Sequence, residues 1–467
     1  MGGLFGTVSK EDCVLDLYYG TDYHSHLGTK RGGIAVKNSQ GFVKTIHNIE
    51  NDYFRSKFEP DLHKFHGSQG IGVISDNDSQ PLVIGSHLGT FAIVTVAKIN
   101  NMNELKKRAL TRGMTFSEIS GEELNPTELI AMLINEQRSF IEGIQHAQAS
   151  IKGSCSLLLL TDKGIFAARD RWGRTPIIIG KKNDAYAATS ETCALPNVGF
   201  EIDRYLGPGE IVFLTPDECE QLAKPGEKMQ VCSFLWVYYG YPASSYEGIN
   251  VESVRYRCGS ALAKNDTVDI DFVAGIPDSG IGHALGYANA AHIPYMRPFV
   301  KYTPTWPRSF MPQNQERRDL VARMKLIPNE ELIKGKKILF CEDSIVRGTQ
   351  LKDNIQILFH YGAKEVHMRP ACPTLIYPCE FLNFSTSRST LDLAGRKAIQ
   401  MLEGSEEAFL KEYGIAGSEK NRLMVEYIRH QLRLTTLKYQ TLEDLVNAIG
   451  LPKIKLCTHC WDGSSYF

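Results

Sequence analysis

The chain has 467 residues, of which 43% are hydrophobic and 22% are charged, and its formal net charge is −1 at pH 7. A net charge so close to zero excludes a global electrostatic field that would recruit nucleic acid or a membrane surface. The length predicts two large domains, or three, because single hydrophobic cores stop growing beyond about 250–300 residues.

No apolar run reaches the roughly 18 residues that indicate a membrane-spanning helix. The N-terminal residues also lack the basic and apolar regions of a signal peptide, so we expect a cytoplasmic protein with no nucleic-acid or membrane partner. The 11 cysteines cannot all pair within one chain. In a reducing compartment, we expect them to be buried thiols or metal ligands rather than disulfides.

Short strands and turns dominate the first 230 residues. Ser156–Thr161 and Gly164–Ala168 predict one hairpin, and Ile177–Gly180 and Ala185–Ala188 predict another. The main helical stretch is predicted at Pro126–Ala149. This half is therefore expected to form stacked sheets with helices outside.

The second half alternates strands and helices. Ile270–Ile276 is an apolar run followed by a loop and a helix that extends through His292. Lys337–Cys341 is another such run, followed by a loop and a helix over Thr349–Tyr361, and Glu365–Met368 begins the next strand. This order predicts a parallel sheet with crossover helices. Ligands of such sheets bind outside the carboxyl ends of the strands.

A charged stretch punctuated by Pro225-Gly226 predicts the boundary between the two halves at Lys224–Val231. We therefore assign residues 1–231 to the first domain and residues 232–467 to the second.

An acidic loop follows the strand at Lys337–Cys341, with the sequence Glu342-Asp343-Ser344-Ile345-Val346-Arg347-Gly348-Thr349. Two carboxylates at a strand end can hold ribose hydroxyls, directly or through Mg²⁺ and water. Backbone N–H groups of the loop and of the following helix N-terminus can receive a phosphate, and Gly348 allows close approach of a ligand. An acidic turn that merely caps a helix is the alternative, but the complete order is more specific and favours a phosphate site.

Two further segments support this interpretation. The loop with Asp278, Ser279 and Gly280 follows a strand and opens a helix, and its small residues would let the backbone wrap a diphosphate. The basic segment from Lys301 to Leu326 is either a solvated loop or a lid that closes over the diphosphate.

The acidic loop resembles the phosphoribosyl pyrophosphate (PRPP) signature of type I phosphoribosyltransferases. The resemblance extends along nearly the whole chain to the amidophosphoribosyltransferases, the glutamine-dependent enzymes that begin purine synthesis. It is carried by Leu15–Val36, Ala167–Pro176, Ser190–Leu195, Pro277–Gly280, Arg308–Phe310, Met324–Leu326 and Asp343–Thr349.

The resemblance implies an N-terminal-nucleophile (Ntn) hydrolase-like αββα sandwich followed by a type I phosphoribosyltransferase domain. It also implies attack of ammonia on C1 of PRPP, giving 5-phosphoribosylamine and diphosphate. A homo-oligomer and a purine nucleotide inhibitor are further implied partners. The implied Mg²⁺ positions are Ser279, Glu342 and Asp343. The implied PRPP contacts are Asp278, Ser279, Gly280, Lys301, Arg318 and Glu342–Thr349, and the implied catalytic residues are Arg308 and Lys325.

Four cysteines match a metal site of this family. Cys457 and Cys460 form a C-x-x-C pair near the end of the chain, and alone this pair would not indicate a metal. Together with Cys232 and Cys379, the resemblance implies a [4Fe–4S] cluster. Four thiolates suit either iron–sulfur or zinc chemically.

The first half departs from the family at its reaction centre. The family requires a cysteine after Met removal, whose thiol attacks glutamine, whereas Gly2 has no nucleophile. Gly72–Asp76 lacks the arginine that clamps the glutamine carboxylate, and Val96–Ile99 lacks the Asn-Gly of the oxyanion hole. His26–Arg31 has also lost the family pattern. We therefore hypothesise that glutaminase activity is lost and that the transferase uses free ammonia or a separate glutaminase partner.

Two alternatives remain at this point. The chain could be a non-catalytic regulatory paralogue that binds PRPP or nucleotides and pairs with the true enzyme. It could also be an iron–sulfur sensor in which transferase chemistry is secondary. The intact acidic loop favours the enzyme.

Overall fold

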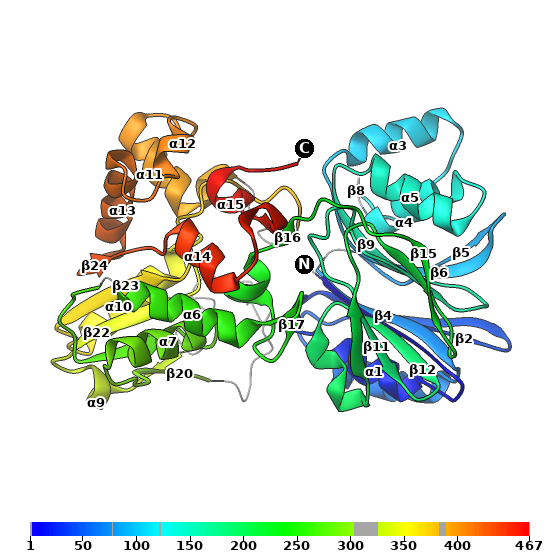
Figure 1. Ribbon diagram of the computed structural model, residues 1–467, viewed down its shortest axis with the longest axis horizontal. Helices are drawn as coiled ribbons and strands as arrows, with labels where there is room; N and C mark the ends of the chain where they lie inside the picture. The colour runs from blue at the N-terminus through cyan, green and yellow to red at the C-terminus, as the bar shows by residue number, and fades with distance from the viewer. Residues whose placement is uncertain are drawn as a thin grey trace.

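The computed structural model describes residues 2–76, 78–120, 123–264, 266–302, 326–382 and 389–466. The chain forms two lobes (Figure 1). In the view of Figure 1 the N-terminal lobe lies on the right and the C-terminal lobe on the left, with α15 (His459–Asp462) and β16 (Val231–Cys232) at the junction.

Two antiparallel sheets build the N-terminal lobe. The first has seven strands in the order β13 (Glu201–Tyr205), β11 (Ile178–Lys182), β12 (Ala185–Thr189), β1 (Gly2–Ser9), β4 (Gln69–Ser75), β2 (Arg31–Asn38) and β3 (Gly41–Asn48). The second has six strands in the order β15 (Cys219–Ala223), β14 (Ile211–Leu214), β10 (Ile165–Ala168), β9 (Gly153–Leu160), β6 (Gly89–Ile99) and β5 (Leu82–Ser86). Both predicted hairpins are confirmed, as β9–β10 and β11–β12.

The sheets stack because each has an apolar inner face. Leu4 and Val73 of the first sheet share a buried cluster with Val94 and Leu158 of the second. Helices cover the outer faces: α1 (Val14–Asp22) lies on the first sheet, and α4 (Pro126–Asn135) and α5 (Phe140–Ser150) lie on the second. The predicted αββα sandwich is confirmed.

One helix prediction was wrong in its extent. Pro126–Ala149 is two helices, α4 and α5, rather than one. Asn125 caps α4 by accepting a hydrogen bond from Thr127 N at 2.9 Å. Ser139 begins α5 in an extended conformation and accepts from Glu142 N at 3.3 Å, so a second N-cap interrupts the apolar periodicity.

A parallel four-stranded sheet forms the centre of the C-terminal lobe. Its order is β19 (Phe272–Gly275), β22 (Lys337–Glu342), β23 (Glu365–Pro370) and β24 (Thr436–Leu437). Helices cover both faces, as the predicted crossover connections require. One face packs on α6 (Val251–Lys264), α7 (Ile281–Ala291) and α14 (Leu442–Ile449), and the other packs on α10 (Thr349–His360), α11 (Ala394–Glu403) and α13 (Glu419–Leu432).

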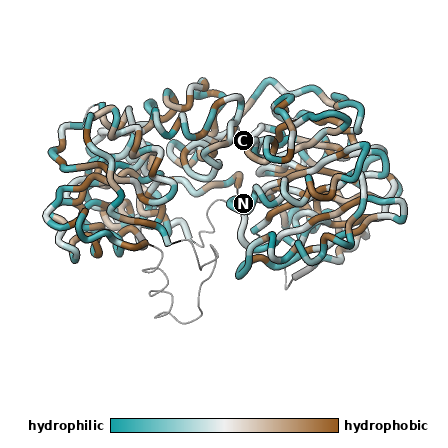
Figure 2. Tube along the Cα trace, turned by 90° about the horizontal axis from the view of Figure 1, so that it is seen from below, coloured by the Kyte–Doolittle hydropathy of each residue, from teal (hydrophilic) through white to brown (hydrophobic). Residues whose placement is uncertain are grey.

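Shorter elements complete the described chain. In the N-terminal lobe these are α2 (Phe54–Phe58), α3 (Met102–Thr111), β7 (Ile119–Ser120) and β8 (Glu123–Leu124). In the C-terminal lobe they are β17 (Ser245–Tyr246), β18 (Ile249–Asn250), β20 (Phe299–Lys301), β21 (Leu326–Pro328), α9 (Glu330–Ile333), α12 (Leu410–Tyr413) and β25 (Leu456–Cys457). Among the described residues, no helix is long and apolar enough to cross a membrane. Hydrophobic segments are concentrated in the interiors of both lobes (Figure 2).

A buried carboxylate joins the lobes. Glu191 is fully buried and contacts His26 Nε2 of its own lobe at 3.0 Å. From the other lobe, Tyr246 donates its hydroxyl to Glu191 at 2.6 Å, and Ser244 donates a second hydroxyl. Burial alone would raise the pKa of Glu191, but His26 and the two hydroxyl donors outweigh it and lower this pKa. The junction is therefore held by an ionised group that both lobes must satisfy.

Candidate functional site

The two loops predicted to bind the diphosphate and the ribose phosphate lie side by side. They follow β19 and β22, which are neighbouring parallel strands. Ile276 N donates to Cys341 O at 3.0 Å, which joins the two strand ends. A Cβ added at Gly280 would lie 2.4 Å from the same Cys341 oxygen, so only glycine fits there without displacing the backbone. Both loops therefore open at the carboxyl edge of the sheet, where ligands of such folds bind.

The acidic pair lies at the centre of this edge. Glu342 and Asp343 are 9% and 5% exposed, and Asp343 N donates to Glu342 Oε1 at 3.1 Å. Burial and the neighbouring Asp343 carboxylate raise the pKa of Glu342 well above its usual range, and a hydrogen bond from Ser279 opposes the shift. Ser344 donates to Asp343 Oδ1 at 2.5 Å. Two buried carboxylates that repel each other are a suitable site for a divalent cation, which would relieve the repulsion.

The rest of the acidic loop leads from the sheet edge into the start of α10. Gly348 has a φ of 74°, a left-handed conformation that favours glycine, and it precedes the first turn of α10. Ile345 is buried beneath the loop, whereas Arg347 and Thr349 are exposed. Val346 O accepts from Ala394 N at 2.7 Å, which fixes the loop against α11. A phosphate at this helix start would meet backbone donors and the positive end of α10.

A cation accompanies the first loop. Lys301, at the end of β20, forms an ion pair with the exposed carboxylate of Asp278. The structure therefore places Lys301 beside Asp278, one of the other residues predicted to contact PRPP. The other predicted basic positions, Arg308, Arg318 and Lys325, lie outside the described residues.

Two buried arginines of this lobe were missed by the sequence interpretation. Arg255 on α6 donates to the carbonyl oxygens of Trp236, Tyr238 and Gly240. Burial lowers the pKa of Arg255, and several anionic groups, including the Asp343 carboxylate, oppose that shift. Arg369 pairs with Asp266, with side-chain exposures of 3% and 7%. Neither arginine belongs to a local motif, so only the tertiary structure reveals their positions.

Gly2 occupies the position of the family's nucleophile, and neighbouring backbone occupies the space that a side chain would need there. Gly2 pairs with Ser75 in the β1–β4 ladder. A Cβ added at Gly2 would lie 2.7 Å from the carbonyl oxygen of Ile74 and 3.5 Å from Val96 Cγ2. A cysteine side chain at residue 2 would therefore require the neighbouring strand to shift.

Among the described residues near Gly2, two segments that bind glutamine in the family carry different side chains. The segment that should carry the carboxylate-binding arginine contributes Asp76, whose Oδ1 accepts from Thr29 N at 2.6 Å. The segment that should supply the oxyanion donors presents the apolar Val96 toward Gly2. Gly2 therefore lies beside Ser75–Asp76 and Val96, with an aspartic acid where the family has an arginine and a valine where it has an oxyanion donor.

The four predicted metal-ligating cysteines converge at the junction between the lobes. Cys232 and Cys457 are direct partners in the parallel pairing of β16 with β25. Cys379 hydrogen-bonds with Cys460, which lowers the pKa of Cys379 to about 6. All four are free thiols, and Cys232, Cys457 and Cys460 are buried.

The chemical type of these four donors limits which metals they suit. Within the described ranges, no group of three or more His, Cys, Asp or Glu side chains is placed so that it could hold a metal ion. Four cysteine thiolates are the donor set of a structural zinc site as well as of an iron–sulfur cluster. The donor set is that of an iron–sulfur cluster, four cysteine thiolates, and so the residues present fit that group chemically.

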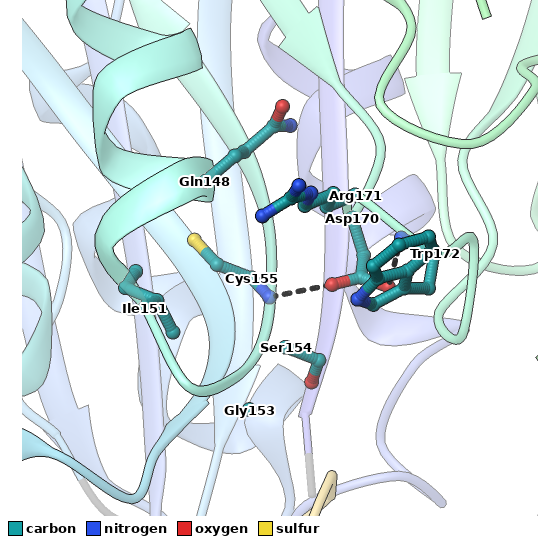
Figure 3. Close-up of a pocket in the computed structure, with 8 residues that line it drawn as sticks. All are labelled: Gln148, Ile151, Gly153, Ser154, Cys155, Asp170, Arg171 and Trp172. Carbon is teal, nitrogen blue, oxygen red and sulfur yellow. Dashed lines mark hydrogen bonds between the residues drawn. The ribbon is translucent and has the colours of Figure 1, made fainter. Parts of the chain in front are cut away.

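A small pocket in the N-terminal lobe is too small for a substrate. Its lining comes from α5, β9 and the segment after β10: Gln148, Ile151, Gly153, Ser154, Cys155, Asp170, Arg171 and Trp172 (Figure 3). Its volume is about 10 Å³, close to what one water molecule requires. Cys155 N donates to Asp170 Oδ1 at 3.1 Å across it. We assign this pocket no catalytic role.

These features define a class: an Ntn-type glutamine amidotransferase sandwich joined to a phosphoribosyltransferase sheet. Residues 67–197 match the family model described as a glutamine amidotransferase domain. The amidophosphoribosyltransferase of Methanocaldococcus jannaschii is 30% identical over 99% of this chain and 97% of its own length. That of Bacillus subtilis is also 30% identical, over 96% of this chain and 89% of its own length. The chain belongs to the amidophosphoribosyltransferase family.

Solved structures agree with this assignment. The glutamine PRPP amidotransferase from B. subtilis, complexed with ADP and GMP, superposes with a TM-score of 0.85 at 27% identity, covering 99% of this chain and 97% of that one. A second structure, described as the allosteric regulatory enzyme of purine biosynthesis, has the same TM-score and covers 96% of its own chain.

Proposed function

We propose that this chain transfers ammonia to C1 of PRPP, giving 5-phosphoribosylamine and diphosphate, and that it does not hydrolyse glutamine. The observation that carries the proposal is a contrast within one chain. The acidic loop keeps its paired carboxylates and its left-handed Gly348, whereas Gly2 lacks a nucleophile and is closed in by Ile74 O. A lobe that served only as a scaffold would have no need of the first arrangement.

The residues of the transferase lobe have distinct roles in this proposal. Glu342 and Asp343 hold the ribose hydroxyls, with Ser279, beside a Mg²⁺ ion. The backbone of Ile345–Thr349 binds the 5-phosphate at the start of α10. Asp278, Ser279 and Gly280 surround the diphosphate, and Lys301 adds positive charge there. Bound Mg²⁺ would neutralise charge on the leaving diphosphate and so lower the barrier to its departure.

Neutral ammonia needs no activating base on this lobe, because it is already a nucleophile. Neutral ammonia already carries a lone pair, and departure of diphosphate leaves positive charge on the sugar ring. In this proposal that charge develops beside the carboxylates of Glu342 and Asp343, which are buried at the sheet edge. The basic residues Arg308, Arg318 and Lys325 would close over the diphosphate and exclude water, which would otherwise compete with ammonia.

The ammonia would come from solution or from a separate glutaminase partner. The B. subtilis relative was solved in complex with ADP and GMP. Because that relative binds purine nucleotides, we propose that they also bind and inhibit this chain. The proposal also includes a homo-oligomer and a [4Fe–4S] cluster on Cys232, Cys379, Cys457 and Cys460. Iron and acid-labile sulfide measured on anaerobically purified protein would test the cluster.

One assay tests the reaction. The purified chain is incubated with PRPP and Mg²⁺, together with either ammonium or glutamine, and diphosphate, phosphoribosylamine and glutamate are quantified. We expect diphosphate and phosphoribosylamine with ammonium, and no glutamate above background with glutamine. Steady glutamine turnover would overturn the claim of a lost glutaminase. Binding of PRPP without product under any nitrogen donor would instead favour the non-catalytic regulatory paralogue.

A further inference from the structure

The N-terminal lobe holds the loop that carries Cys379. The carbonyl oxygens of residues 379–381 accept side-chain hydrogen bonds from Lys98 Nζ, Asn100 Nδ2 and Ser154 Oγ, respectively. The bond from Asn100 is 2.7 Å long. All three donors belong to the N-terminal lobe and all three acceptors to the C-terminal lobe. We name residues 379–382 the Cys379 loop.

The three donors lie on two neighbouring strands of the six-stranded sheet and at the end of one of them, which together we name the platform. Lys98 on β6 and Ser154 on β9 are direct register partners in the six-stranded sheet. Asn100 follows the end of β6, and its N–H donates to Lys152 O at 2.8 Å. Ser154 also lines the small pocket of Figure 3, and the next residue on β9, Cys155, donates its backbone N–H to Asp170. Because the platform is part of a packed sheet, the three donors have fixed spacing and can capture three consecutive carbonyls.

A second contact holds the same loop from the side. The guanidinium carbon of Arg174 lies 3.7 Å from the centre of the Phe381 ring, and Arg174 also donates to Gln230 at 3.0 Å. Arg174 is fully buried, and its charge lies near the thiol of Cys457. Together with Lys98, it brings two positive charges from the N-terminal lobe to a group of four cysteines. Four metal-bound thiolates carry excess negative charge, and burying such a group is favourable only with compensating cations.

The location of Lys98 connects this contact to the lost reaction. It lies in Val96–Ile99, the stretch that matches the family's oxyanion-hole segment. Val96 of this stretch faces Gly2, and Lys98 bonds to the other lobe. One short segment therefore presents an apolar group to the former glutamine site and a cation to the cysteine site.

We propose that Lys98, Asn100 and Ser154 are positioning residues for Cys379, so that the N-terminal lobe serves as a structural part of the four-cysteine centre. This inference rests on the proposed function in assigning a metal cluster to that centre. The three hydrogen bonds from Lys98, Asn100 and Ser154, which we name the Cys379 clamp, form within the protein chain alone. They therefore fix the position of Cys379 whether or not a metal is bound.

The test compares four full-length proteins: the unaltered chain, Lys98→Met combined with Ser154→Ala, Lys98→Arg, and Lys152→Met. Lys98→Met with Ser154→Ala removes two donors, whereas Lys98→Arg keeps a donor and a charge. Lys152→Met is the matched control, because Lys152 is in the same lobe and its ammonium pairs with Glu104 at 3.7 Å instead of the Cys379 loop. Circular dichroism and PRPP calorimetry establish that each protein is folded.

The first readout is the rate at which iron leaves the reconstituted protein in the presence of a chelator. Loss of residues that orient metal ligands costs about 10–100-fold in metal affinity. We therefore expect the double variant to release iron about ten-fold faster or more, and Lys98→Arg and Lys152→Met to behave like the unaltered chain. Equal rates for the double variant and the unaltered chain would overturn the proposal.

The second readout separates the clamp from the metal. Alkylation of Cys379 is followed by mass spectrometry in metal-free protein, with buried Cys155 as the internal reference. The clamp predicts faster alkylation of Cys379 in the double variant and no change at Cys155. If the unaltered chain retains neither iron nor zinc, the metal assignment fails and this readout alone decides the inference. Unchanged alkylation of Cys379 would then reject the clamp.

Discussion

The two lobes of this protein differ in the groups that they place at the family's two reaction centres. In the C-terminal lobe, buried carboxylates, a left-handed glycine and a helix start still converge at one sheet edge. In the N-terminal lobe, the place of the nucleophile holds Gly2, and its neighbours are Ile74 O and a valine methyl group. The sandwich does not depend on these reactive groups, because its stability comes from the apolar faces of two sheets. The fold of this lobe therefore does not require the family's reactive groups to be present.

The largest effect is expected at Asp343. Asp343→Ala removes one of the two carboxylates that hold the ribose and Mg²⁺, and we expect kcat/KM for ammonia transfer to fall by about 100-fold or more. Asp353→Ala is the matched control, because Asp353 is an exposed carboxylate on α10. Steady-state kinetics with ammonium would measure both. An Asp343→Ala enzyme with nearly full activity would show that the reaction does not depend on Asp343 and would contradict the site proposed at the acidic loop.

A smaller effect is expected at Gly348. Gly348→Ala forces a side chain into a φ of 74° and places its Cβ 3.3 Å from Leu432 Cδ2, so we expect a cost of about 1–2 kcal/mol. Gly335→Ala is a matched control, since Gly335 has a φ of 73° and open space around its Cβ position. Thermal unfolding should show destabilisation in both variants. Calorimetry should show weaker PRPP binding only for Gly348→Ala, and equal PRPP binding by the two would argue against a phosphate in this loop.

A pH dependence is expected at the junction between the lobes. The pKa of Glu191 in the folded protein is lower than its ordinary value of 4.5, so the unfolded chain binds the proton more readily. Its contribution to stability is therefore complete above about pH 4.5 and is lost as the pH falls through the folded-state value. Glu191→Gln should flatten this part of the curve in urea unfolding, whereas Glu201→Gln, an exposed control on β13, should leave it intact. An unchanged curve for Glu191→Gln would mean that Glu191 does not hold the junction.

The smallest effect is expected from restoring the nucleophile alone. Gly2→Cys supplies a thiol, but it supplies neither a carboxylate clamp nor oxyanion donors, and its Cβ would crowd Ile74 O. We expect glutamate release from glutamine to stay at the background of the unaltered chain. Measurable turnover by Gly2→Cys would show that the loss depends on one residue and that the surrounding site is intact.

Local patterns predicted much of the fold. The apolar runs at Ile270–Ile276 and Lys337–Cys341 gave two adjacent parallel strands, observed as β19 and β22 with ends shifted by up to two residues. Turn residues gave both N-terminal hairpins. The single helix predicted at Pro126–Ala149 failed because the apolar periodicity continues across Ser139, where a side-chain cap starts a new helix.

The site was predictable only where it is local. The acidic loop is one continuous segment, and the loss of the nucleophile can be read from Gly2. In contrast, Lys98 contacts Cys379, which is 281 residues away in the sequence, and no periodicity or motif links them. Arg369 and Asp266 are likewise 103 residues apart. Such pairs depend on how the lobes and strands pack, which one sequence alone does not specify.

We propose that one lobe is chemically active while the other has lost its reaction. The most direct measurement follows a heavy-nitrogen label from either ammonium or the amide of glutamine into phosphoribosylamine formed from PRPP and Mg²⁺, with the trapped product analysed by mass spectrometry. We expect label in the product from ammonium and none from glutamine. Transfer of label from glutamine by the purified chain would contradict this proposal. So would a failure to consume PRPP with either donor.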